Sequence, residues 1–207
     1  MTKKVIIDQM QRSVELTFPL KRIVSLVPSQ TELLHYFGLE QEVVAITKFC
    51  IHPKNWHAEK QRIGGTKKLN IDQIIALKPD LIIGNKEENT KEDISILEEV
   101  VPVWMSDVNT FDAALDFILD IGSLFGKIEI AKTLNTEITS RINFDLLKED
   151  VANKSSNVTT DASSTTKYGF VVDCVVGVTP SSNLAVLSTE RVYLLPSISP
   201  LAGSIEL

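Results

Sequence analysis

The sequence predicts an α/β protein: a parallel-sheet lobe with flanking helices, followed by a long backbone helix. Three observations lead to this prediction. Short β-branched apolar runs alternate with amphipathic helical segments through the first 110 residues, as in parallel sheets joined by helical crossovers. Residues 127–150 keep apolar residues at helical spacing over about 35 Å, more than cover for one small sheet requires. After residue 150 the composition changes, and we expect a second lobe that is truncated or atypical.

The strands are predicted where apolar runs of strand length lie between turn residues. The first two runs are separated by a polar turn and form a hairpin, and the other four belong to the parallel sheet. These runs are residues 5–7, 14–17, 22–28, 42–47, 80–84 and 102–105. Residues 48–69 are predicted to form a long loop.

The helices are predicted from capping residues and apolar spacing. Ser29 and Glu32 fit a capping box at the start of the first helix, which Gly38 ends. Asn70 and Thr90 are predicted to cap the next two helices. The helical segments are residues 29–37, 70–78, 90–100, 111–125 and 127–150.

These elements divide the chain into three regions. Residues 1–109 form an N-terminal α/β lobe, and residues 110–150 a helical segment that includes the backbone helix. Residues 151–207 are an atypical, partial or diverged C-terminal lobe: they carry seven of the 48 charged residues and 16 Ser or Thr.

The composition excludes several classes of protein. With 207 residues, 43% hydrophobic and 23% charged, the chain is not disordered, collagenous or a small disulfide scaffold. Two cysteines, Cys50 and Cys174, are too few for a disulfide framework. A net charge of −6 suits neither nucleic acid nor an anionic membrane. We therefore expect a monomer without a nucleic-acid partner.

The N-terminal residues predict the compartment. The printed sequence begins without the apolar run of a secretory signal, and no segment reaches membrane-spanning length. We therefore expect a cytoplasmic protein from the sequence as given. A signal upstream of Met1 would instead direct it to the periplasm or to a membrane surface.

An ordered series of motifs resembles the substrate-binding proteins of cobalamin and ferric-siderophore ABC importers, the helical-backbone metal receptors. The resemblance covers roughly residues 20–150. Its motifs are RIVSLVPSQTEL (22–33), TKFCIHP (47–53), IGGTKKLNID (63–72), LKPDLII (77–83) and NKEENTKED (85–93). It implies two lobes on a rigid helix that bind a cobalamin-like corrinoid or a ferric siderophore between them. It also implies no catalysis, no intrinsic cofactor, and an ABC permease as partner.

Ligands of open parallel sheets gather beyond the carboxyl ends of the strands, which points to three loops. Ser29 and Gln30 lie at a helix N-terminus whose free amides favour an anionic group, although capping alone also explains Ser29. Phe49, Cys50 and His52 supply an aromatic ring and soft or borderline donors; simple loop packing is the alternative. In the family this loop lines the ligand cleft. No further donors lie at zinc-site spacing, so no metal site is predicted.

The third loop begins at Gly84. Lys86 and Glu87 can reach polar edges of a ligand, or can belong to a solvated charged loop. Asp72 matches the position at which the family carries an acid that forms a salt bridge with a permease arginine. An acid that only stabilises the first turn of a helix is the alternative for Asp72.

Two other functions stay open. The first is a cytoplasmic metal-handling protein or an enzyme on the same lobe, which Cys50 and His52 motivate. The second is an incomplete fragment without independent function. The sequence holds neither a G-x-S-x-G elbow nor an H-E-x-x-H motif, so we predict that the chain is not an enzyme.

Overall fold

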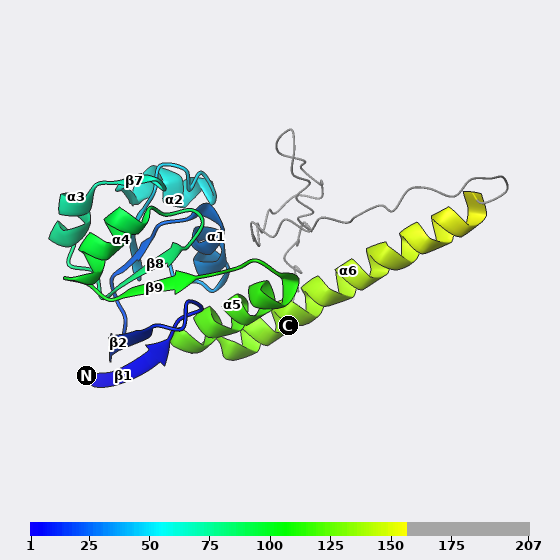
Figure 1. Cartoon of the computed structure of the whole chain (residues 1–207), viewed down its shortest axis with the longest axis horizontal. Helices are drawn as coiled ribbons and strands as arrows, with labels where there is room; N and C mark the ends of the chain where they lie inside the picture. Colours follow the sequence, from blue (N-terminus) through cyan, green and yellow to red (C-terminus); the bar gives the residue numbers. More distant parts are fainter. Residues whose placement is uncertain (157–207) are drawn as a thin grey trace, which may run out of the picture.

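The computed structural model describes residues 1–156, and the side chains of residues 1–142 (Figure 1). The predictions for residues 157–207, including Cys174, lie outside the described residues. In chain order the elements are β1 (Thr2–Ile7), β2 (Ser13–Phe18), β3 (Ile23–Ser25), α1 (Pro28–Tyr36), β4 (Val43–Ile46), α2 (Lys54–Glu59), β5 (Gln61–Arg62), β6 (Gly64–Gly65), β7 (Lys68–Leu69), α3 (Ile71–Ala76), β8 (Leu81–Asn85), α4 (Lys91–Glu98), β9 (Val103–Ser106), α5 (Phe111–Leu124) and α6 (Ile128–Ser156).

A five-stranded parallel sheet forms the centre of the lobe, which confirms the predicted fold class. The strand order is β5-β4-β3-β8-β9, and every neighbouring pair is parallel. β1 and β2 form the predicted antiparallel hairpin. The prediction of one long loop over 48–69 was wrong, because this segment contains α2 and three two-residue strands. Strands that short show no periodicity in a sequence.

The alternation of side chains along the strands produces two apolar cores. Leu81 and Ile83 of β8 face one side of the sheet, and Ile82 faces the other. The first core also contains residues of the hairpin, α1, α2, α5 and α6, and the second contains residues of α3 and α4. Both faces of the sheet are therefore covered by helices, as the apolar strand runs predict.

α6 is the predicted backbone helix and spans 29 residues. Figure 1 shows it running beside α5 and then extending well beyond the lobe. The two helices lie close together at Gly122, where an added Cβ would be only 2.5 Å from Cβ of Ala131. A residue larger than glycine at position 122 would therefore push α6 away from α5.

The N-termini of α1, α3 and α4 test the capping residues predicted for these helices. Asn70 caps α3 as expected: its side chain accepts a hydrogen bond from Gln73 N at 3.2 Å. The capping box at Ser29 is wrong, because α1 begins one residue earlier, at Pro28, with Val27 as a cap that makes no side-chain hydrogen bond. Proline has the backbone angle of a first helical residue already, so Pro28 starts the helix by itself. Thr90 is the N-cap residue of α4, but its side chain forms no capping hydrogen bond.

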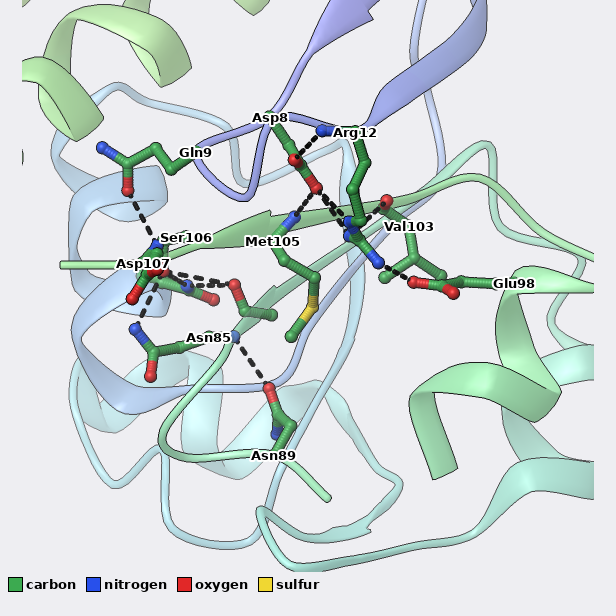
Figure 2. A network of polar contacts seen from close by, with 12 residues as sticks. Asp8, Gln9, Arg12, Asn85, Asn89, Glu98, Val103, Met105, Ser106 and Asp107 are labelled. Carbon is green, nitrogen blue, oxygen red and sulfur yellow. Dashed lines mark hydrogen bonds and ion pairs between the residues drawn. The ribbon is translucent and has the colours of Figure 1, made fainter. Parts of the chain in front are cut away.

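The turn between β1 and β2 lies against β9, the outermost strand of the sheet (Figure 2). The buried carboxylate of Asp8 accepts hydrogen bonds from Met105 N at 3.2 Å and from Arg12 Nε at 2.8 Å. Gln9 N donates to Met105 O at 3.2 Å, and the Arg12 guanidinium also pairs with Glu98. The turn thus satisfies backbone groups that an edge strand would otherwise leave open to another chain.

We expect Asp8→Ala to lower the free energy of unfolding by about 2–3 kcal/mol, because it leaves Met105 N and the Arg12 guanidinium without their shared acceptor. Urea unfolding followed by circular dichroism measures the change. Glu15→Gln is the control, because it breaks the exposed Lys3–Glu15 pair of the same hairpin and should change stability little. An Asp8→Ala protein as stable as this control would contradict the assignment.

Candidate ligand-binding site

The candidate site lies at the carboxyl edge of the sheet, where the chain changes direction. From β3 the chain proceeds to β4 on one side, whereas β8 and β9 lie on the other. The crevice beyond such a switch point is where open α/β sheets bind ligands. The N-terminus of α1, the loop after β8 and the end of β9 meet at this point.

A buried polar network joins these three segments, and we call it the switch-point network (Gln30, Gly84, Asn85, Asn89 and Ser106). Gln30 Nε2 donates to Gly84 O at 2.8 Å and to Ser106 Oγ at 3.0 Å. Ser106 Oγ also accepts from Asn85 Nδ2 at 3.0 Å and donates to Gly84 O at 3.3 Å. The Ser106 hydroxyl therefore uses its donor and both of its acceptor positions.

The network also shows where the two residues selected in the first loop lie. Gln30 is only 2% exposed and Ser29 is also buried, so neither offers its side chain at the surface. The amide nitrogen of Gln30 instead holds the ends of β8 and β9 together. Among the described residues its Oε1 has no hydrogen-bond partner. Its orientation is fixed, because a flipped amide would place Oε1 against the Gly84 carbonyl oxygen.

Two asparagines shape the loop that follows β8. Asn89 Oδ1 accepts from Asn85 N at 2.8 Å, and Asn85 Oδ1 accepts from Glu87 N at 2.9 Å. A Cβ on Gly84 would lie 2.8 Å from Asn89 Oδ1, so this close approach requires glycine. The loop presents Lys86 and Glu87 to solvent. Sequence reasoning did not select Asn85 and Asn89, although two asparagines directly after a strand are a known turn signal.

Lys86, an exposed charge of this loop, is paired across the strand ends. Lys86 Nζ lies 2.7 Å from Asp107 Oδ2, and this hydrogen bond raises the pKa of Lys86. Asp107 follows β9 directly, and Figure 2 shows it beside Ser106 at the same edge of the sheet. The sequence analysis missed Asp107, because no local motif surrounds it.

Phe49 lies where the second loop meets a groove. Its ring is 52% exposed, and Lys48 Nζ lies 5.1 Å from the ring centroid. The groove has a volume of about 900 Å³ and runs along Lys48, Phe49 and residues 64–72. A Cβ on Gly65 would lie 3.0 Å from Phe49 Cε2, so the ring rests on the backbone of this glycine. Asp72 lies in the same groove, exposed in the first turn of α3.

The structure places Cys50 inside the lobe, in agreement with the alternative of loop packing. Its side chain is fully buried; Thr31 Oγ1 donates to Sγ at 3.1 Å, and Thr47 Oγ1 shares a hydrogen bond with Sγ at 3.2 Å. Burial raises the pKa of this thiol, in spite of its hydrogen bonds with both threonines. Cys50 thus anchors the loop from inside the lobe. His52 is half-buried on the outer part of the loop. Among the described residues, no group of three or more His, Cys, Asp or Glu side chains is placed to hold a metal ion.

A parallel-sheet lobe with its candidate site at the carboxyl edge, continued by a long helix, defines the class of α/β fold to which the chain belongs. The chain belongs to the periplasmic binding protein family, whose model matches residues 23–164.

The chain is also similar in sequence to individual members with known names. The chain is 28% identical over 126 residues to a vitamin B12-binding protein of Vibrio cholerae, a match that covers 60% of this chain and 45% of the relative. The vitamin B12-binding protein of Yersinia pestis is 32% identical over 102 residues, which cover 47% of this chain and 36% of that protein. The chain thus spans less than half the length of these relatives. Their names describe binding proteins rather than enzymes.

Solved structures show the same fold. The periplasmic vitamin B12 binding protein BtuF of Vibrio cholerae superposes with a TM-score of 0.55 at 28% identity, over 66% of this chain and 53% of that one. The petrobactin-binding protein YclQ of Bacillus subtilis superposes with a TM-score of 0.63 at 18% identity, over 69% and 52% of the two chains. Within residues 1–156, no helix combines the length and the apolar character of a membrane span.

The reactivity of the Cys50 thiol tests whether its side chain is buried in the native protein. In a Cys174→Ser background, we expect the Cys50 thiol to react with a disulfide reagent only after denaturant is added, because it is inaccessible and its pKa is raised. Absorbance of the released thiol measures the rate. Complete modification of the native protein within seconds would contradict the placement of this side chain.

Proposed function

We propose that this chain is a substrate-binding protein of the ABC-importer type that binds a cobalamin-like corrinoid or a ferric siderophore at the carboxyl edge of its sheet. The observation that carries the proposal is the exposed Phe49 ring beside a lysine-lined groove, in a member of the periplasmic binding protein family. Binding is the whole activity, without catalysis. The partners are a small metal chelate and an ABC permease, and the protein acts as a monomer without nucleic acid.

The side chains at this edge suit such a ligand. A half-exposed aromatic ring binds the flat or apolar face of a large ligand, as a corrin or a siderophore provides. Lys48, Lys67 and Lys68 line the groove and attract anionic oxygen atoms on the ligand. Lys67 also donates to the Glu87 carbonyl oxygen, which joins the groove to the loop after β8.

The proposed site has two kinds of residue. Phe49, His52, Lys86 and Glu87 contact the ligand, because they lie on the outer parts of their loops. Ser29, Gln30 and Cys50 are buried and hold those loops in place. The binding groups are thus supported by a rigid layer beneath them.

Asp72 is the proposed docking acid for the permease. It is exposed on α3. An importer receptor of this type works outside the cytoplasmic membrane, so the proposal includes that location for the working protein. The metal-handling alternative has less support, since Cys50 points into the core and no cluster of three His, Cys, Asp or Glu suited to a metal occurs among the described residues.

We expect the purified chain to bind cyanocobalamin or one of several ferric siderophores, and Phe49→Ala to weaken that binding by about 10- to 100-fold. Titration calorimetry and absorbance measure the affinity. Ile51→Ala is the matched control: Ile51 is 54% exposed on the same loop but does not line the groove. If no tested chelate binds more tightly than about 100 μM, roughly −5.5 kcal/mol, the proposal is wrong. Equal losses in the two variants would remove Phe49 from the site.

A further inference from the structure

Gln9, in the turn between β1 and β2, makes hydrogen bonds to both sides of one loop. Figure 2 shows the bond to Asp107. Its Oε1 accepts from Asp107 N at 3.1 Å, and its Nε2 donates to Ala113 O at 2.9 Å. Its backbone N donates to Met105 O at 3.2 Å. The side chain thus contacts the segment after β9 and the first turn of α5 at the same time.

The bridged loop is the covalent link between the sheet and the two long helices. β9 ends at Ser106 and α5 begins at Phe111, so residues 107–110 carry the chain from one to the other. Thr110 Oγ1 accepts from Ala113 N at 3.1 Å, while Gln9 donates to the carbonyl oxygen of the same residue. Ala113 is therefore held on both of its backbone groups by side chains outside the helix.

An amide side chain suits both of these bonds, because it carries one acceptor group and one donor group. The Asp107 N–H requires an acceptor, and the Ala113 carbonyl requires a donor. A flipped amide would place two donors together at Asp107 and two acceptors together at Ala113, so the orientation of the Gln9 amide is determined by its partners. The neighbouring Asp8 is fixed to β9 by its hydrogen bond from Met105 N, which holds the turn itself in place.

We propose that Gln9 is a positioning residue that sets the angle between the sheet and the α5–α6 pair. Hydrophobic packing is not directional, whereas a two-sided hydrogen bond at the connecting loop has a direction and favours one arrangement of these elements. The same bond holds Asp107, the partner of Lys86 at the candidate site. The N-terminal hairpin is thereby coupled to the ligand-facing edge of the sheet.

The test compares three variants of the full chain by NMR. Gln9→Leu removes both side-chain bonds at similar volume. Gln9→Glu keeps an acceptor for Asp107 N and loses the donor to Ala113 O. Leu16→Val trims a buried residue of the same hairpin that makes no hydrogen bond to the loop, and it controls for general loss of stability. Amide exchange at Asp107 reports the first bond, and residual dipolar couplings of the sheet and of α5 report the angle.

In the unmodified chain and in Leu16→Val, we expect one alignment tensor to fit both the sheet and α5. In Gln9→Leu, exchange at the Asp107 amide should accelerate about tenfold, and the two tensors should separate. In Gln9→Glu, Asp107 should stay protected while the tensors separate.

A Gln9→Leu protein with one tensor and unchanged Asp107 exchange would overturn the proposal. If Gln9→Leu does not fold, Gln9→Glu decides the question: separated tensors support the role of Gln9, and a single tensor rejects it. No ligand is present in either measurement, so the result does not depend on the proposed transport function.

Discussion

The buried carboxylate of Asp8 is the contact on which the arrangement of the lobe depends. It attaches the hairpin turn to β9, which would otherwise be an open edge of the sheet. Once the turn is fixed, Gln9 reaches the loop before α5, and β9 presents Ser106 to Gln30 from the opposite side. One carboxylate in an N-terminal turn therefore supports the sheet edge, the helical pair and the candidate site.

The candidate site has two layers, a buried layer of polar residues and an exposed layer above it. Polar residues beneath the surface, among them Gln30 and Ser106, bond to one another and to the ends of the strands. Of the residues at the surface, Phe49 is half-exposed, and Lys86 is paired with Asp107 by a solvent-exposed contact. Because a buried polar group is costly when a partner is lost, the lower layer resists rearrangement. A receptor that binds with little loop movement needs such a layer.

The parts of the fold that follow from local patterns could be predicted from the sequence. Strands such as β8 are continuous apolar runs, and the spacing of α5 and α6 is helical over many residues. Asn70 caps α3 because its partner, Gln73 N, is only three residues away. Phe49 was selected because its loop follows a predicted strand and because the family resemblance places that loop at the ligand cleft; its contact with a ligand stays a prediction.

The remaining features depend on residues far apart in the chain. Gln30 and Ser106 are separated by 76 residues, and Gln9 and Asp107 by 98, so no local pattern connects them. The local sequence left ligand contact and loop packing open for Cys50, and the burial of its thiol depends on Thr31, which is 19 residues away. Each two-residue strand within 48–69 exists because another strand pairs with it, and its own sequence is too short to carry a strand pattern.

Backbone amide chemical shifts recorded during a titration show whether the carboxyl edge of this sheet binds a metal chelate, as we propose. With cyanocobalamin or a ferric siderophore added, we expect the largest shifts at residues 48–52, 64–68, 85–89 and 107. Amides at the opposite edge of the sheet and on the outer face of α4 should stay unchanged. Saturable shifts confined to α4 or to the hairpin, with the carboxyl edge unaffected, would contradict the proposal.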